Sequence, residues 1–511
     1  MVGKLRRTGY FLTESIHAEG LFMVFSDLFF LYVFIPAVMI CYALARCADR
    51  AYVGGFDSGR YSRPANTAPY SNAVLVVFSL IFYAWGEPVY VFLMLGSVLM
   101  NYVVGLCIDR GKRKSKAALA VGVTLNVAMI AVFKYAGFLA GIVAALGVPL
   151  PIPDIALPIG ISFYTFQSIS YLADVYRGEV PAQRSFWSLL LYISMFPQLV
   201  AGPIVRYSTI SAEINERRIT FSDLAEGSFR FLIGLGKKVI LANELSELSG
   251  QFLDGDLGAL TTGGAWLGII AFTFQIYFDF SGYSDMAIGM GRCLGFHFDE
   301  NFEYPYVSCT ITEFWRRWHI SLGSFFRDYV YIPMGGNRKH QPLNIMVVWF
   351  LTGLWHGASW NFVLWGVYFG VIIMLEKYTI IKVRYKIPSF ILHIYSLLLI
   401  VFGWVIFYFD DFTRLGGFIK VLFGFAGAGG GDLMLKNTLF TNLWLLIAAA
   451  VFSMPVGKLV RRLYDKADSA DSAAPLALMT FGKICCACLI LAASTLLLIG
   501  DTTNAFLYTR F

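Results

Sequence analysis

The segment Met346–Trp365, MVVWFLTGLWHGASWNFVLW, decides the fold class. No Asp, Glu, Lys or Arg occurs from Asn344 to Leu375, yet His356 lies inside this run. A helix of about 20 apolar residues crosses the hydrocarbon core of a bilayer. An ionisable side chain at that depth is costly and usually serves a transport pathway or a reaction. We therefore expect a membrane segment in which His356 is either a functional imidazole or a neutral histidine hydrogen-bonded between helices.

The composition extends this expectation to the whole chain. Of its 511 residues, 58% are hydrophobic and only 14% are charged, whereas a soluble domain has about 25% charged residues. A soluble protein of this composition would expose large apolar patches and aggregate. The sequence therefore predicts an all-α, polytopic integral membrane protein, with about ten to thirteen membrane segments of roughly 20 residues each.

The expected membrane segments are apolar runs of helical length. They cover residues 28–45, 73–85, 89–108, 117–135, 155–173, 186–205, 264–280, 345–355 continuing through 360–375, 389–409, 439–452 and 474–499. A further helical segment, residues 224–242, carries Arg230, Lys237 and Lys238, so we expect it in the membrane interface or lining a cavity. Basic clusters between the apolar runs indicate cytoplasmic loops.

We expect one polytopic domain, from residue 23 to residue 500. Residues 1–22 are interpreted as an extension or a mis-called start, since Met23 begins the phrase MVFSDLFFLYVFIP, and residues 501–511 as a tail. Gly and Pro interrupt the apolar runs from Pro158 (PIGISF) and from Ala201 (AGPIV). Broken helices at membrane depth need surrounding protein or a water-filled cavity. The catalytic core is therefore expected at about residues 155–370.

His319 is the second candidate, within TEFWRRWHISLGSFFRDYVYIPMGGNRKH (residues 312–340). At helical spacing Trp315, His319 and Leu322 share one face, while Arg316 and Arg317 point elsewhere. A basic amphipathic helix at the membrane surface would explain the arginines, although it explains the histidine less well. In a functional interpretation, the arginines hold the phosphates of a donor such as coenzyme A.

Several classes of function are excluded or disfavoured. The net charge of +7, with basic residues clustered between apolar runs, does not indicate a nucleic-acid binder, and the eight cysteines show no metal-ligand spacing. No Walker A, Rossmann, HExxH or GxSxG motif accompanies the candidates, so nothing supports an ATP-driven pump, a dehydrogenase or a serine hydrolase. For Asp279 and Asp285, a structural salt bridge or helix cap is the favoured interpretation.

Five strings of the sequence resemble the membrane-bound O-acyltransferase superfamily. They are LPIGISFYTFQSISYLADVYRGEV (157–180), FPQLVAGPIVRY (196–207), QIYFDFSGYSDMAIGMGRCLGF (275–296), FWRRWHISLGSFFRDYVYIPMGGNR (314–338) and LTGLWHGASWNFVLWGVYFG (351–370). Within the superfamily they look like the bacterial alginate O-acetyltransferase branch, which is related to the teichoic-acid D-alanine transfer protein. The phrase that begins at Met23 is similar to the opening of the alginate-type branch.

This resemblance implies a ring of helices around a central tunnel, with His356 and His319 as the catalytic residues. The donor would be acetyl-CoA or another acyl thioester, and no bound cofactor or metal is expected. His356 would act as general base or relay the acyl group, and His319 would orient the donor or stabilise the tetrahedral intermediate. Further candidates for binding the substrate or donor are Arg316, Arg317, Trp315, Trp355, Asn361, Asp279 and Gln198.

The resemblance also implies a multi-pass protein of the bacterial cytoplasmic membrane. The acetyl group would pass to an extracytoplasmic partner of the SGNH-hydrolase type and then to a polysaccharide such as alginate. Three alternatives stay open at this point. They are D-alanyl transfer to teichoic acid, a polysaccharide or lipid transporter without chemistry, and a scaffold for polymer export.

Overall fold

The computed structural model describes residues 23–57, 66–110, 115–148, 150–153, 155–200, 202–428, 433–469 and 473–500. These residues form helices joined by loops, and the extended structure among them is limited to one isolated bridge, between Phe302 and Trp318. The expected extension at residues 1–22 and the tail at 501–511 lie outside the described residues. The all-α fold class predicted from the sequence is confirmed.

Seven helical spans of the described chain are long and apolar enough to cross a membrane. They are η1 with α2 (Phe30–Phe34, Ile35–Asp57), α3 (Pro69–Gly86), α4 (Tyr90–Arg110), α5 with η2 and α6 (Ser115–Ile130, Ala131–Tyr135, Ala136–Ala145), α17 with α18 and η6 (Trp360–Tyr378, Ile380–Val383, Arg384–Lys386), α19 (Ser389–Tyr408) and α24 (Ala473–Gly500). A pair bent by 55°, α21 (Leu433–Thr441) and α22 (Leu443–Phe452), could form an eighth. The protein is therefore a polytopic membrane protein, with fewer such spans than the ten to thirteen expected.

The difference arises because the central runs form short or charged helices. The run at 186–205 breaks into α8 (Phe186–Ser194) and α9 (Phe196–Leu199), followed by extended chain. In the run at 155–173 the first residues are not helical, and the helix α7 (Ile161–Arg177) begins only at Ile161. The run at 345–375 breaks after His356, which ends α16 (Gln341–His356). Because an α-helix rises 1.5 Å per residue, such pieces are shorter than the hydrocarbon core of about 30 Å.

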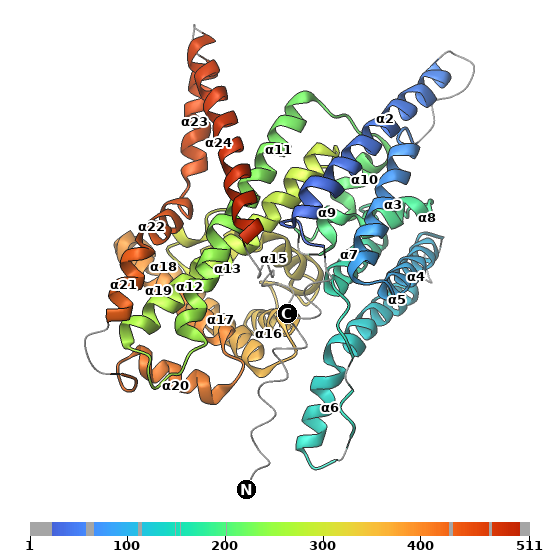
Figure 1. Ribbon diagram of the computed structural model, residues 1–511. Helices are drawn as coiled ribbons and strands as arrows, with labels where there is room; N and C mark the ends of the chain where they lie inside the picture. Colours follow the sequence, from blue (N-terminus) through green and yellow to red (C-terminus); the bar gives the residue numbers. More distant parts are fainter. Residues whose placement is uncertain are drawn as a thin grey trace, which may run out of the picture.

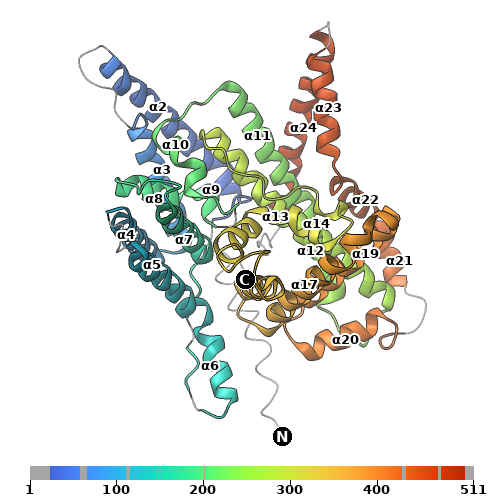
Figure 2. The same ribbon diagram turned by 180° about the vertical axis from the view of Figure 1, so that it is seen from behind.

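The long helix α13 (Thr262–Cys293) lies at the centre of the molecule and is buried along most of its length (Figures 1 and 2). Phe280 and Tyr283 belong to a hydrophobic core shared with the N-terminal helices, whereas Phe272 and Tyr277 belong to a second core shared with α17 and α19. The remaining helices are α10 (Tyr207–Asn215), α11 (Phe221–Gly236), η3 (Lys237–Asn243), α12 (Glu244–Leu253), η4 (Pro305–Val307), α14 (Ile311–Arg317), α15 (Ile320–Phe326), η5 (Arg327–Tyr331), α20 (Phe412–Leu422) and α23 (Val456–Asp468). Two pieces extend away from this body: α6 in one direction, and the pair α23 and α24 in another (Figure 1).

Helices α11 and α13 pack with their backbones in direct contact through two pairs of glycines. A Cβ added at Gly234 would lie 2.5 Å from the carbonyl oxygen of Gly282, and one added at Gly282 would lie 2.8 Å from that of Gly234. Gly227 and Gly289 oppose each other in the same reciprocal way, at 2.7 and 2.6 Å. Helices in membranes associate through such small residues because van der Waals packing, rather than a hydrophobic driving force, holds them together.

Ion pairs cross the same α11–α13 contact. Arg230 and Lys237 lie 2.9 and 2.6 Å from the carboxylate of Asp285, and Lys238 lies 2.7 Å from that of Asp279, with less than 5% of either side chain exposed in the Asp279 pair. Residues 224–242 are therefore packed on α13 through these charged side chains. The salt-bridge interpretation of the two aspartates agrees with the structure.

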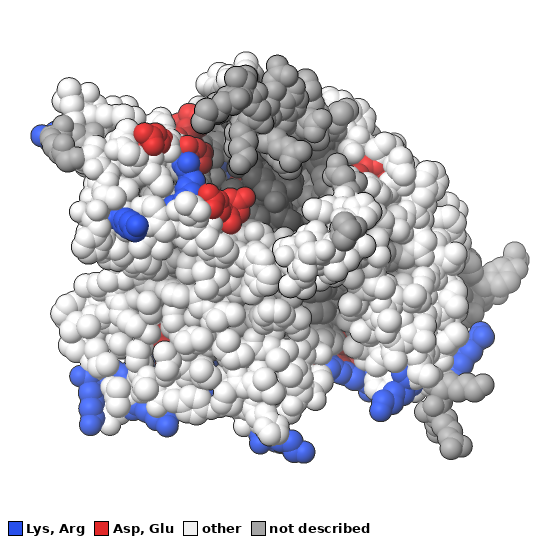
Figure 3. Space-filling model, turned by 90° about the horizontal axis from the view of Figure 1, so that it is seen from below, with Lys and Arg blue, Asp and Glu red and all other residues white. Residues whose placement is uncertain are grey.

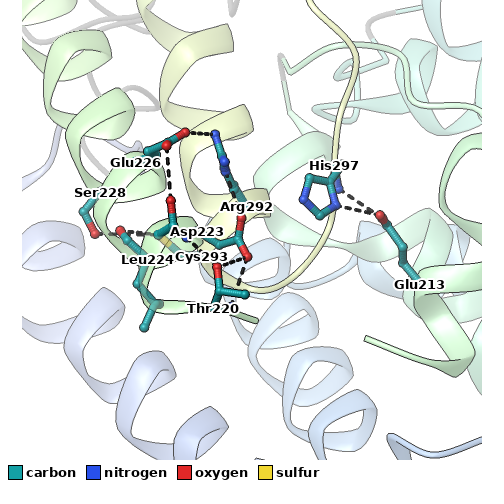
Figure 4. A network of polar contacts seen from close by, with 10 residues as sticks. Glu213, Thr220, Asp223, Leu224, Glu226, Ser228, Arg292, Cys293 and His297 are labelled. Atoms are coloured by element: carbon teal, nitrogen blue, oxygen red, sulfur yellow. Dashed lines mark hydrogen bonds and ion pairs between the residues drawn. The ribbon is translucent and has the colours of Figure 1, made fainter. Parts of the chain in front are cut away.

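A polar network fixes the loops at one end of this contact (Figure 4). Thr220 and Asp223 form a capping box at the start of α11, and Arg292, near the end of α13, lies 3.2 Å from Asp223. The hydrogen bond from the Thr220 side chain, with help from Arg292, lowers the pKa of Asp223 below its usual value. Beside this group, His297 lies 2.7 Å from Glu213 of α10. The network joins the loops before α11 and after α13 to each other and to α10.

The surface has the charge distribution of a membrane protein. On the face shown in Figure 3, Lys and Arg gather along one edge, and a broad area above that edge carries almost no charge. Acidic and basic residues appear again at the upper part of this face. The uncharged band is the surface expected to face lipid, and the basic edge is expected on the cytoplasmic side by the positive-inside rule.

The glycine contact generates a test of the fold. Gly234→Ala should lower the thermal unfolding temperature of the purified protein, because the new methyl group meets backbone that cannot move aside; overpacking of this kind costs about 1–3 kcal/mol. Gly96→Ala in α4, where nothing lies within 4 Å of the added Cβ, is the matched control and should leave that temperature unchanged or raise it. Equal effects of the two substitutions would contradict the backbone contact.

Candidate active site

His319 lies between α14 and α15 in a left-handed backbone conformation, with φ 47° and ψ 53°. Backbone pairing with the preceding loop holds it there: the Ile320 N–H donates to the Asn301 carbonyl at 3.0 Å, next to the Phe302–Trp318 bridge. The expected continuous helix with Trp315, His319 and Leu322 on one face is therefore wrong. A non-glycine residue in this conformation costs about 1–3 kcal/mol, and such residues cluster at functional sites.

The side chain of Asn301 fixes the proton on the His319 ring. The Ser321 backbone N–H, which can only donate, lies 3.2 Å from Asn301 Oδ1, so that atom is the amide oxygen. His319 Nδ1 lies 3.2 Å from the same oxygen and 3.4 Å from Ser321 Oγ, and because two acceptors cannot share a hydrogen bond, we assign the ring hydrogen to Nδ1. Neutral His319 then has its acceptor lone pair on Nε2, a buried atom without a hydrogen-bond partner among the described residues.

His356 is the last residue of α16 and is almost completely buried, with 6% of its surface exposed. Three aromatic rings surround its imidazole, those of Trp355 and Trp365 with centroids at 4.9 Å and that of Phe407 at 5.4 Å. Its Nδ1 has no hydrogen-bond partner in the described part of the chain. The imidazole is thus held by packing, with a ring nitrogen left for chemistry.

Trp355 brings the two histidines into one aromatic cluster. Its indole contacts His319 at 5.5 Å between ring centroids and also contacts His356, its neighbour in the sequence. Trp315 joins the cluster through Trp365, at 5.3 Å. Four of the predicted residues, His356, His319, Trp355 and Trp315, are therefore found together, although they come from α16, the α14–α15 junction and α14.

The other predicted residues have described contacts elsewhere. Asn361 donates from Nδ2 to the Phe407 carbonyl at 3.2 Å, so it supports the ring that packs on His356. Arg317 pairs with Glu313 at 2.9 Å, and Arg316 is exposed. Asp279 belongs to the ion pair with Lys238 described above. Gln198 is buried in α9, and its amide nitrogen donates to the Tyr192 carbonyl.

Three residues near the histidines were missed by the sequence reasoning. Lys134 donates from Nζ to the carbonyls of Trp355 and His356, and the Tyr135 hydroxyl donates to the Leu354 carbonyl at 2.5 Å. A single lysine inside the apolar run 117–145 was a signal that could have identified Lys134. No local pattern in the sequence could have identified Asn301, because its hydrogen-bond partners lie 17–20 positions away from it in the chain.

The arrangement provides two imidazoles in a largely dry, aromatic site. A neutral imidazole with a free ring nitrogen can accept a proton from a hydroxyl or a hydrogen bond from a substrate. Exclusion of water strengthens every electrostatic interaction with charge that develops there. Across the residues that the structure describes, no group of three or more His, Cys, Asp or Glu side chains is placed to hold a metal ion.

Comparison with known proteins agrees with this chemistry. The model of the membrane-bound O-acyltransferase family matches residues 179–415, a range that includes both histidines. A probable alginate O-acetylase of Azotobacter vinelandii is 35% identical over 96% of this chain and 100% of its own length. A peptidoglycan O-acetyltransferase of Helicobacter pylori is 32% identical over 86% of this chain and 91% of its own. A teichoic acid D-alanyltransferase of Bacillus subtilis is 29% identical over 42% of this chain and 57% of its own.

The similarity to the Azotobacter protein extends over almost the entire chain, well beyond the five strings quoted from the sequence. Similarity at this identity and coverage is found between members of one family. The chain therefore belongs to the membrane-bound O-acyltransferase family, in the branch of the alginate O-acetylases as its sequence predicted, and it is an O-acyltransferase.

Proposed function

We propose that the protein passes an acetyl group from cytoplasmic acetyl-CoA across the bacterial cytoplasmic membrane, for O-acetylation of an extracytoplasmic polysaccharide. The observation that supports the proposal best is the pair of buried histidines, His319 and His356, which both contact the indole of Trp355. The names of the alginate O-acetylase and peptidoglycan O-acetyltransferase relatives support acetyl as the acyl group and a glycan as the acceptor.

In the proposed reaction His356 is the general base. The acceptor hydroxyl attacks the thioester carbonyl carbon, its proton moves to the imidazole of His356, and the carbon–sulfur bond breaks to release the thiolate of coenzyme A. The thiolate then takes up the proton. A thioester is already activated, so the step needs no ATP, and a positioned general base contributes about 10²- to 10⁴-fold in rate.

His319 would orient the donor. Neutral His319, with its hydrogen on Nδ1 and directed to Asn301, can only accept a hydrogen bond at Nε2. Stabilising an oxyanion requires a donor. Of the two roles considered for His319, accepting a hydrogen bond from an N–H or O–H of the donor or acceptor is therefore the better supported.

The acceptor side of the proposal includes a second protein. We expect the acetyl group to leave the membrane through an extracytoplasmic partner of the SGNH-hydrolase type, which then modifies the polysaccharide. This part rests on the resemblance to the alginate-type branch. Co-purification of the tagged chain with such a partner from membranes is the direct measurement.

D-alanyl transfer to teichoic acid is the second candidate. The D-alanyltransferase of B. subtilis matches 42% of the chain, whereas the alginate O-acetylase of A. vinelandii matches 96%, and this difference favours acetyl transfer. Chemical analysis of the ester groups on the cell's polymers separates the two, since base releases acetate in one case and alanine in the other.

The catalytic assignment predicts the behaviour of a His356→Ala strain. Loss of the base should reduce the alkali-labile acetate on the polymer by about 10²-fold or more, with normal amounts of polymer and of the protein in the membrane. His393→Ala, which changes a partly buried histidine bonded to the Ser308 carbonyl in the loop before α14, is the control and should retain acetylation. Unchanged acetylation in the His356→Ala strain would refute the assignment, and loss of the polymer itself would indicate a transporter or scaffold.

The proton assignment on His319 predicts a second effect. Asn301→Ala removes the acceptor that holds Nδ1–H, so the imidazole can rotate or change tautomer; the rate of transfer from labelled acetyl-CoA in membranes should fall by about 10- to 100-fold. Asn337→Ala, at an exposed hydrogen-bonded asparagine after η5, should leave that rate unchanged. An Asn301→Ala protein that is present in the membrane and fully active would show that the tautomer is unimportant.

A further inference from the structure

The C-terminal end of α16 is capped by two adjacent residues of another helix. The last four carbonyls of any α-helix lack partners within the helix. In α16 the carbonyl of Leu354 accepts from the Tyr135 hydroxyl, and those of Trp355 and His356 accept from the Lys134 ammonium. Three of the four carbonyls are therefore satisfied by residues 134 and 135, which lie 219–222 positions away in the sequence.

Within the described ranges, the ammonium of Lys134 donates its hydrogen bonds to the carbonyls of Trp355 and His356. Its Nζ lies 6.0 Å from the centroid of the Trp355 indole. A charge in an apolar run is expensive unless something compensates it. The negative end of a helix dipole is such a compensation, and it acts within the last turn of the helix.

The local geometry of the donor segment is unusual as well. Lys134 and Tyr135 belong to η2, a single turn of π-helix between α5 and α6. Single-turn π-bulges inside α-helices occur frequently at functional sites. On the other side of the contact, α16 ends at His356, because the backbone of Gly357 is extended. The Phe362 ring packs directly on Gly357, since a Cβ added there would lie 2.3 Å from the ring.

We propose that Lys134 is a positioning residue for His356. By binding the last two carbonyls of α16, its ammonium fixes the backbone from which the imidazole of His356 and the indole of Trp355 project. Its hydrogen bonds go to main-chain oxygens, so it acts through the backbone of His356 rather than on the reacting atoms. The inference rests on the proposed role of His356 as base.

A positioning residue and a purely structural one differ in what their removal changes. Loss of a structural contact lowers the amount or thermal stability of the protein, and the molecules that remain folded work normally. Loss of positioning lowers the turnover number of folded protein, since a displacement of about 1 Å at a reacting group can cost 10²-fold in rate. Substrate binding made by other residues is retained, so KM changes little.

The test measures acetyl transfer from labelled acetyl-CoA in membranes, at equal amounts of folded protein. Lys134→Met removes the charge and the donors at similar length and should lower kcat by about 10- to 100-fold, with KM for acetyl-CoA within about threefold of the unmodified protein. Lys134→Arg keeps the charge and the donors and should restore most of the activity. Lys116→Met, at an exposed lysine near the start of α5 in the same span Ser115–Ala145, is the control and should behave as the unmodified protein.

Tyr135→Phe keeps the proposal testable where Lys134→Met fails to fold. It removes one hydrogen bond to the Leu354 carbonyl without leaving a charge unpaired, and kcat should fall by about two- to tenfold. The inference is overturned if folded Lys134→Met protein has an unchanged kcat. If Lys134→Met is missing from the membrane, an unchanged kcat of Tyr135→Phe overturns it instead. Equal loss in Lys134→Met and Lys134→Arg would do so too.

His356→Ala is measured in the same assay to separate the two proposals. An active His356→Ala protein would refute the general-base role and with it the basis of the inference. An inactive His356→Ala protein beside a fully active Lys134→Met protein would refute the positioning role alone.

Discussion

The structure depends on one constraint: a helix that ends inside a dry protein must find partners for its terminal backbone groups. Three such ends belong to helices that carry or adjoin residues of the candidate site. The Glu376 carboxylate accepts from the backbone N–H of Ile311 and Thr312 at the start of α14, at 2.6 and 2.7 Å. Asn301 accepts from the N–H of Ser321 at the start of α15, and Lys134 donates to the end of α16. Buried side chains thus replace the water that would cap these helices at a surface.

Both histidines occur where helices are interrupted in this way. His319 occupies the break between α14 and α15, and His356 the break between α16 and α17. A side chain within a regular helix can only follow the direction of its face. A residue at a break can point where the loop directs it, provided that the caps hold the loop still. The polar capping residues therefore serve the fold and the geometry of the site at the same time.

The sequence was sufficient for the fold class and family, and for only part of the site. Composition predicts the membrane helices, and the charge-free run around His356 singles out that residue. The break at His319 could not be predicted, because the local spacing fits a helix. The helix is interrupted instead by the bridge of Trp318 to Phe302, which lies 16 positions before Trp318. The partners of Lys134 lie 221 and 222 positions away, and no local pattern carries such information.

The glycine pairs of α11 and α13 have a consequence for evolution. A side chain added at Gly234 meets the carbonyl oxygen of Gly282, which belongs to the main chain and is present whatever residue stands there. No substitution on one helix can therefore compensate for a substitution on the other. The four positions should each be invariant among relatives and should not covary. This close contact between two central helices would then be nearly invisible to methods that infer proximity from correlated substitutions.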